Sequence, residues 1–260
     1  MRTLALLLMT ALPALAQGNP PGLVSAELLP GWVTADGARM TALDVRLEPG
    51  WKTYWRSPGD AGIPPAFDWQ GSANLGRVEM LWPLPEVIDS GGERTLGYHE
   101  RLVLPIRIAP ARPGAPVELR AEVEMGICED ICVPVSVSLR ADPPRDAPDP
   151  LIEAALARLP VPADLQPACR IREIEDGMRV TALLPETGRA AGDEVALELR
   201  GSDVWVSAPE LRDEGGRMAV EADFVAASGK PFPLDPDDLR LTLIGARDAI
   251  ELQGCAEVQG

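Results

Sequence analysis

The chain has 260 residues, of which 46% are hydrophobic and 25% are charged, and its formal net charge is −16. This composition is typical of a globular protein with one large or two ordinary domains, and it excludes a disordered chain. The acidic excess argues against nucleic acid and anionic membrane surfaces as partners, because both would repel the chain. The 27 prolines and 24 glycines follow no period, which excludes collagen and favours a turn-rich, mostly β protein.

The first residues predict a secretory signal peptide. Arg2 supplies the positive charge, residues 4–12 form an apolar run, and Ala14-Leu15-Ala16 has the small residues of a cleavage site. A membrane-spanning helix needs about 20 apolar residues, so the run is too short for an anchor. A short buried helix is the alternative. We therefore expect cleavage after residue 16 and a soluble periplasmic protein without membrane insertion, in a compartment that permits disulfides.

The part from about residue 23 to 140 has the period-two alternation of antiparallel strands. Apolar residues occupy the odd positions of 43–47, 117–127 and 133–139, and polar residues occupy most of the even ones. Further strand candidates are 75–82 and 101–108. Several short strands separated by Gly/Pro turns predict an immunoglobulin-like β-sandwich.

The proline-rich stretch 141–150 is the clearest boundary in the chain. After it, Asp149 is placed to cap a short helix over 150–159, with Pro150 in the first turn and Pro160 ending it.

The β pattern resumes at about residue 165. Asp176-Gly177 is a hairpin signal, and apolar alternation returns over 180–184, 195–199, 218–224 and 239–243. We expect an all-β fold of two immunoglobulin-like sandwiches. The expected divisions are a signal peptide (1–16), a first domain (17–142), a linker with a short helix (143–164) and a second sandwich (165–260).

Aromatic residues concentrate in the first half, where five of the six tryptophans and both tyrosines lie. Segment 51–69 alone carries five aromatics, and it is too rich in proline and glycine to be one strand. We predict a long ordered loop, the kind of segment on which binding surfaces usually lie. The alternative is that these aromatics fill the core.

The four cysteines divide into two kinds by spacing. Cys128 and Cys132 form a tight C-x3-C, whereas Cys169 and Cys255 lie near the two ends of the second half. Four cysteines allow three pairings, and local pairing gives one bridge in each domain. Closing a loop of about 87 residues would stabilise the fold by about 4.5 kcal/mol, but a five-residue loop by only about 2 kcal/mol. The long bridge is therefore predicted to be structural, and the short one is the candidate for redox chemistry.

The strand phase adds a second expectation. Continued alternation would place Cys128 in phase with the polar even positions before it, and Cys132 in phase with Ser136 and Ser138. Both sulfurs would then lie outside the core, at the tip between two strands. A passive tip disulfide and metal ligation remain alternatives, although His99 alone would leave a tetrahedral zinc site short of ligands.

Two motifs resemble a known family. The run Val123–Pro134 resembles the cysteine-bearing strand pair of the N-terminal periplasmic domain of DsbD, the thiol:disulfide interchange family. The W-x-T-Y-W-x-x-P-G-D-x-G pattern at Trp51–Gly62 is similar to that of its ScsB-like branch. GYHERLVLPIRI at 97–108 resembles the family's strand after its active-site cap. The likeness covers roughly residues 25–140.

This resemblance implies a domain that carries reducing equivalents outside the cytoplasm. By motif, Cys132 is the thiol that exchanges with partner disulfides and Cys128 resolves the mixed disulfide. The family's cap loop would fall near Ile88–Leu96, which has no aromatic residue here. The candidate cap or partner-binding residues are therefore Trp51, Tyr54, Trp55 and Tyr98.

The sequence is compatible with three functions. The first is a periplasmic thiol:disulfide oxidoreductase, a protein-disulfide reductase component of the kind used in cytochrome c biogenesis. It would need no cofactor, be re-reduced by a separate membrane-embedded thiol reductase and act on thioredoxin-like or disulfide-bonded periplasmic proteins. Glu129 and Asp130 would raise a thiol pKa there, which suits a reductant. The second is a non-enzymatic binding or assembly protein with two structural disulfides. The third is copper handling by the cysteine pair with Met125.

Overall fold

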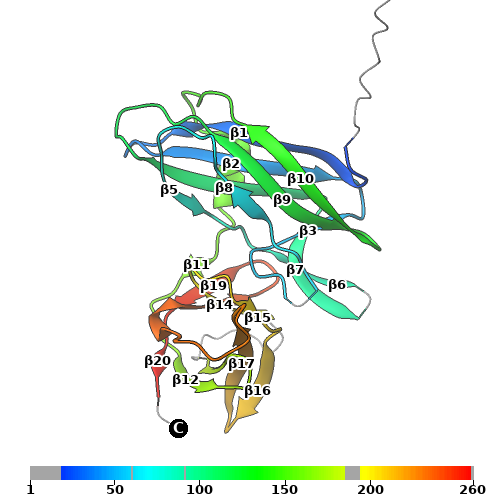
Figure 1. The fold of residues 1–260 in the computed structure, drawn as a ribbon, viewed down its shortest axis with the longest axis vertical. Coiled ribbons are helices and arrows are strands. Elements are labelled where there is room, and N and C mark those ends of the chain that lie inside the picture. The colour runs from blue at the N-terminus through cyan, green and yellow to red at the C-terminus, as the bar shows by residue number, and fades with distance from the viewer. Residues whose placement is uncertain (1–18, 60, 91, 185–193, 259–260) are drawn as a thin grey trace, which may run out of the picture.

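A computed structural model describes residues 19–59, 61–90, 92–184 and 194–258 (Figure 1). Strands in several sheets make up most of these residues, with one short α-helix and one 3-10 turn in the described ranges. The predicted signal peptide, 1–16, lies outside them. No helix within these ranges has the length and apolar character needed to cross a membrane.

Strands β1 to β10 form two sheets, which we call the first sandwich. One sheet has the order β1-β2-β8-β5, with β1 (Leu23–Val33), β2 (Arg39–Leu47), β8 (Arg101–Pro110) and β5 (Leu75–Met80). The other has the order β10-β9-β3-β7-β6, with β10 (Cys132–Arg140), β9 (Arg120–Cys128), β3 (Lys52–Tyr54), β7 (Glu93–His99) and β6 (Glu86–Ser90), and β4 (Ala66–Asp68) also pairs with β9.

The predicted alternation holds along β9. Ala121, Val123, Met125 and Ile127 are all buried, and the polar residues between them up to Glu124 are exposed. β10 runs antiparallel to β9 in unbroken register, with Val135 opposite Met125 and Val137 opposite Val123. A single apolar face therefore extends along this hairpin into the core.

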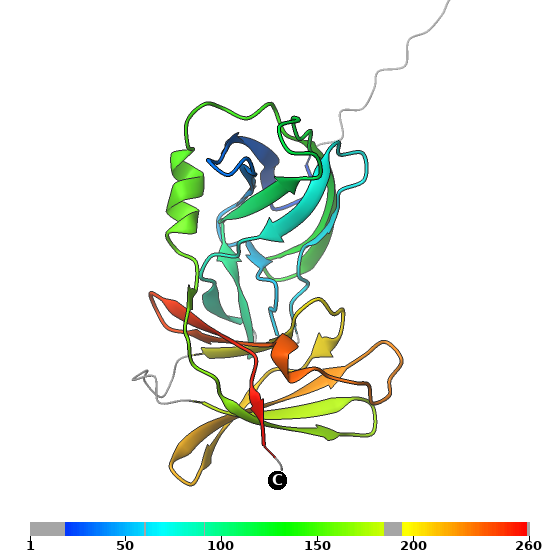
Figure 2. The same ribbon diagram turned by 90° about the vertical axis from the view of Figure 1, so that its left-hand side faces the viewer.

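Strand β2 also alternates between apolar and polar residues, but both faces of the strand are buried. Ala42 packs with Ile152 of helix α1 (Pro150–Leu156), which lies along the outer side of the sheet (Figure 2). Asp44 is also buried, and it accepts two hydrogen bonds of 2.8 Å from the Arg101 guanidinium. The predicted polar face of this strand thus lies under the helix and an ion pair.

Helix α1 begins as the sequence predicts. The Asp149 side chain accepts a 2.9 Å hydrogen bond from Leu151 N, and Pro150 occupies the first position. The helix ends at Leu156, three residues before the predicted end, and turns lead to Pro160. Its buried residues, Ile152 and Ala155, fix it against the first sandwich.

The remaining strands form a second pair of sheets, the second sandwich. One has the order β11-β19-β18-β14, with β11 (Val161–Pro162), β19 (Ala249–Gln253), β18 (Leu239–Ile244) and β14 (Glu194–Leu199). The other has the order β15-β17-β13-β12-β20, with β15 (Trp205–Val206), β17 (Arg217–Val225), β13 (Met178–Leu183), β12 (Ala168–Glu173) and β20 (Ala256–Glu257), and β16 (Glu210–Glu214) also pairs with β17. A 3-10 turn, η1 (Pro236–Asp238), precedes β18. The predicted hairpin is confirmed, since Glu173 pairs with Met178 around the turn.

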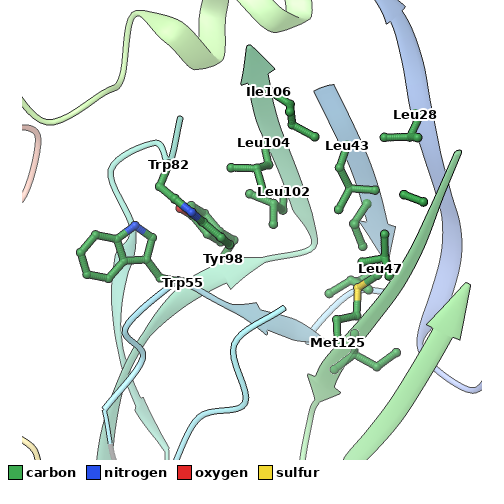
Figure 3. Close-up of a cluster of buried hydrophobic side chains, with 14 of the residues drawn as sticks. Leu28, Leu43, Leu47, Trp55, Trp82, Tyr98, Leu102, Leu104, Ile106 and Met125 are labelled. Atoms are coloured by element: carbon green, nitrogen blue, oxygen red, sulfur yellow. The ribbon is translucent and has the colours of Figure 1, made fainter. Parts of the chain in front are cut away.

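Each sandwich has its own core, and the two cores are in contact. In the first, Trp55, Trp82 and Tyr98 lie on one side of the β8 row and Met125 lies on the other (Figure 3). Ala196, Ile244 and Ala249 of the second sandwich belong to the same apolar cluster. The second sandwich therefore packs against the end of the first from which β3, β6 and β7 project (Figure 1).

Candidate functional site

The tip of the β9/β10 hairpin holds the short cysteine pair. Cys128 ends β9, Cys132 begins β10, and the two lie directly opposite each other with their Cα atoms 4.2 Å apart. Their sulfurs form a disulfide. The three intervening residues make the turn, so the bridge closes a minimal loop and adds little to folding stability.

A second disulfide joins Cys169 of β12 to Cys255, which follows β19. Both residues are buried in the core of the second sandwich. The two pairs are those expected from the spacing. The bridge spans 86 residues and ties the two ends of this sandwich together.

The two cysteines of the short pair differ in exposure, and this corrects the expectation that both sulfurs lie outside the core. Cys132 is exposed, but Cys128 is only 2% exposed. The cause is that the last residues of β9 are covered on both faces. A Cβ on Gly126 would lie 3.0 Å from the Ile63 side chain and 3.4 Å from the Tyr54 ring. Tyr54 and Ile63 thus cover the face that strand phase alone would leave in water.

Tyr54 provides the contact with sulfur. Its hydroxyl donates to Cys128 Sγ at 3.0 Å and lies 3.6 Å from Cys132 Sγ. The residue is 2% exposed. Tyr54 ends β3, the strand that pairs with β9, so backbone pairing brings its side chain to the same face as the disulfide.

The other three aromatic candidates belong to the core. Trp51 packs against Gly22, where any Cβ would lie 2.2 Å from the indole. Trp55 is fully buried. The Tyr98 hydroxyl donates to Pro83 O at 2.8 Å, and burial raises the pKa of this phenol well above its ordinary value. Of the four candidates, Tyr54 is the one for which the structure gives a contact with the cysteines.

The segment expected to form a cap loop, Ile88–Leu96, has a different structure. Its two ends lie in strands β6 and β7, which pair as a hairpin. In the sheet order β9-β3-β7-β6, this hairpin is separated from the cysteine strand by β3. The cover over Cys128 therefore comes from β3 and the segment that follows it.

Charged residues surround the disulfide on both sides. Glu129 and Asp130 are exposed in the turn, and Lys52 is the cross-strand neighbour of Cys128 on β3, itself only 6% exposed. The position of Lys52 was missed in the sequence, although it lies two residues before Tyr54 and so on the same face of the strand. No group of three or more His, Cys, Asp or Glu side chains suited to a metal occurs among the described residues.

Comparison with known proteins gives two kinds of likeness. Residues 25–143 match the family model described as thiol:disulfide interchange protein DsbD, N-terminal. The N-terminal periplasmic domain of ScsB from Proteus mirabilis is 24% identical, with a TM-score of 0.60, and the match covers 90% of this chain and 92% of that one. This likeness shows the all-β immunoglobulin-like fold over both sandwiches.

A second solved structure matches about half of the chain. It is the Neisseria meningitidis DsbD N-terminal domain in the reduced form, at 14% identity and a TM-score of 0.29, with 49% of this chain and 86% of that chain covered. No curated protein sequence matches the chain.

Proposed function

We propose that this chain, whose residues 25–143 form a DsbD-like N-terminal domain with a thiol:disulfide interchange role, carries reducing equivalents through Cys128 and Cys132. The observation that carries the proposal is the asymmetry of the disulfide. Cys132 is an exposed residue, while Cys128 is a buried residue whose sulfur accepts a hydrogen bond from a tyrosine hydroxyl.

The reducing half-reaction begins with the reduced pair. The Cys132 thiolate attacks one sulfur of a partner disulfide, and the other partner sulfur leaves as a thiolate that takes a proton. The Cys128 thiolate then attacks Cys132 Sγ, which releases the partner's first sulfur. Two electrons and two protons have moved to the partner, and Cys128–Cys132 is oxidised.

A dithiol must then regenerate the pair. We propose a separate membrane-embedded thiol reductase, whose thiolate attacks Cys132 Sγ because Cys128 is covered. Cys128 leaves as a thiolate, and the Tyr54 hydroxyl at 3.0 Å is placed to donate to it. The second thiolate of the reductase then attacks its own sulfur in the mixed disulfide, which releases Cys132 as a thiolate and leaves the reductase oxidised; both cysteines take up protons. The exposures of the two cysteines thus support the roles that the family resemblance implies for them.

The compartment and the division of the chain belong to the same proposal. The ScsB match is named as a periplasmic domain, which supports a periplasmic location here, with export by a signal peptide over 1–16. A core cluster made only of second-sandwich residues supports a redox domain over 17–142 and a second sandwich over 165–260, joined by linker 143–164. Within the second sandwich, Cys169–Cys255 is proposed to act as a structural bridge.

Trapping of mixed disulfides tests the proposal. Cys128→Ser leaves Cys132 without its resolving partner, so the variant should accumulate mixed disulfides with periplasmic proteins that appear on non-reducing gels. Cys132→Ser is the matched control and should trap far fewer. The pair of variants should remain folded, because the five-residue loop contributes only about 2 kcal/mol. If neither traps a partner and native wild-type protein resists millimolar dithiothreitol, the interchange role is wrong and a structural sandwich remains.

A further inference from the structure

A buried ion-pair cluster joins the two sandwiches. Arg56, which follows β3, reaches two carboxylates of the second sandwich, with Nε 2.9 Å from Glu198 Oε1 and Nη2 2.7 Å from Glu251 Oε2. Its Nη2 also donates to Thr242 Oγ1 at 3.3 Å. We call Arg56, Glu198 and Glu251 the clamp.

The centre of the clamp is shielded from water. The side chains of Arg56 and Glu198 are 12% and 10% exposed, and that of Glu251 is 26% exposed. Burial alone would lower the pKa of the Arg56 guanidinium, but the carboxylates of Glu198 and Glu251 outweigh it and raise this pKa above its ordinary value. The guanidinium also lies 4.2 Å from the ring centroid of Trp55, a cation–π contact. These contacts hold the planar guanidinium of Arg56 in a single orientation.

The same segment holds Tyr54. Backbone hydrogen bonds from Trp55 N to Leu96 O and from Leu96 N to Pro58 O fasten the chain to β7 on both sides of Arg56. Beyond them the chain turns back, so that a Cβ on Gly62 would lie 2.3 Å from Pro58 Cβ and 2.9 Å from Tyr54 Cδ1. The residues that pack against the Tyr54 ring therefore belong to the same segment that the clamp anchors.

We propose that the second sandwich, through the clamp, positions the Tyr54 hydroxyl against Cys128 and so sets the reactivity of the redox disulfide. Arg56 is in this sense a positioning residue that acts through Tyr54. The inference deepens the proposed function by giving the second sandwich a part in it. It differs from a purely architectural interface, in which loss of the clamp would change stability but not the chemistry of the disulfide.

A double-mutant cycle separates these two cases. Reduction of Cys128–Cys132 by dithiothreitol is followed by stopped-flow tryptophan fluorescence in wild type, Arg56→Gln, Tyr54→Phe and the double variant, at a temperature at which all four are folded by circular dichroism. Arg56→Gln should slow reduction by about threefold in the wild-type background, and it should add no further slowing to Tyr54→Phe. Arg56→Lys, which keeps the charge but not the two-pronged geometry, should restore part of the rate.

Two further variants complete the design. Arg170→Gln removes an exposed ion pair with Glu214 in the second sandwich and should leave the rate unchanged. Glu251→Gln removes one carboxylate and leaves Glu198 in place, so its reduction rate should lie between those of wild type and Arg56→Gln. This variant keeps the test available if Arg56→Gln does not fold.

Two outcomes overturn the inference. One is an unchanged rate in folded Arg56→Gln or, where that variant does not fold, in Glu251→Gln. The other is equal slowing by Arg56→Gln in the wild-type background and in the Tyr54→Phe background. Because dithiothreitol needs no protein partner, a failure to trap partners does not decide the coupling, and an unchanged rate in Arg56→Gln does not decide the trapping experiment.

Discussion

Replacing Tyr54 by phenylalanine removes one oxygen atom from beside the disulfide and leaves the ring in place. The hydroxyl lies 3.0 Å from Cys128 Sγ, and its residue is 2% exposed, so water cannot readily substitute for it. A hydroxyl donates only weakly to a neutral disulfide sulfur. It donates far more strongly to the thiolate that forms when Cys132 Sγ is attacked and Cys128 leaves.

The size of the effect follows from this difference. A hydrogen bond to a charged group contributes about 1.5–3 kcal/mol. The leaving sulfur carries roughly half of its charge in the transition state of thiol–disulfide exchange. The barrier should therefore rise by about 1 kcal/mol, which slows reduction about fivefold. In the reduced protein, the pKa of the Cys128 thiol should rise, because its thiolate loses a donor.

Stopped-flow reduction by dithiothreitol measures the rate, and the pH dependence of alkylation measures the thiol pKa. Tyr98→Phe is the matched control. Its hydroxyl is equally buried but donates to Pro83 O, so its loss should lower stability and leave the exchange rate unchanged. Reduction of Tyr54→Phe at the wild-type rate would refute the hydrogen-bond argument. Faster reduction would refute it as well, and would assign the tyrosine a shielding role.

Three further expectations concern other parts of the chain. Replacing Cys169 and Cys255 together by serine should lower the free energy of unfolding by about 4.5 kcal/mol in denaturant titrations and leave thiol exchange at the first sandwich intact; unchanged stability with lost exchange would reverse the two assignments. The hydrogen bond from Arg179 lowers the pKa of the Asp223 carboxyl below its ordinary 3.8, so its contribution to stability is present above that pH and is lost as pH falls through the lowered pKa. Asp223→Asn should accordingly flatten the acid limb of melting temperature against pH, and an unaltered limb would contradict this. Mass spectrometry of the exported protein should show cleavage after Ala16, whereas an intact leader in the membrane fraction would exclude it.

Much of the fold could be predicted because its signals are local. Alternation located β9 and β10, and the capping residue Asp149 located the start of α1. Both disulfide pairings also followed from spacing, since each bridge lies within one sandwich. The strands, the helix start and the Cys128–Cys132 pair depend on neighbours along the chain or on pairing within one hairpin. The pairing of Cys169 with Cys255, 86 residues apart, followed instead from the expectation of one bridge in each domain.

The burial of Cys128 could not be obtained in the same way. Strand phase reports which face of a strand points to its own sheet's core, and by that rule Cys128 points outward. Its actual cover comes from Tyr54 and Ile63, which are distant from it in the sequence and follow no regular period. The Trp-rich motif marked their segment as important, but it did not distinguish Tyr54, which reaches the sulfur, from Trp51 and Trp55, which fill the core.

The clamp shows the same limit at a longer range. Glu198 lies on β14 with an ordinary strand pattern around it, and nothing near it in the sequence indicates a cationic partner 142 residues away. A carboxylate that is 10% exposed needs such a partner, because an unpaired buried charge is strongly destabilising. Arg240 meets this need from within the second sandwich, at 2.7 Å, so the arginine from the first sandwich is not required to neutralise Glu198. The link from Arg56 therefore joins the two sandwiches, and on the side of the first sandwich it anchors the residues that directly follow Tyr54.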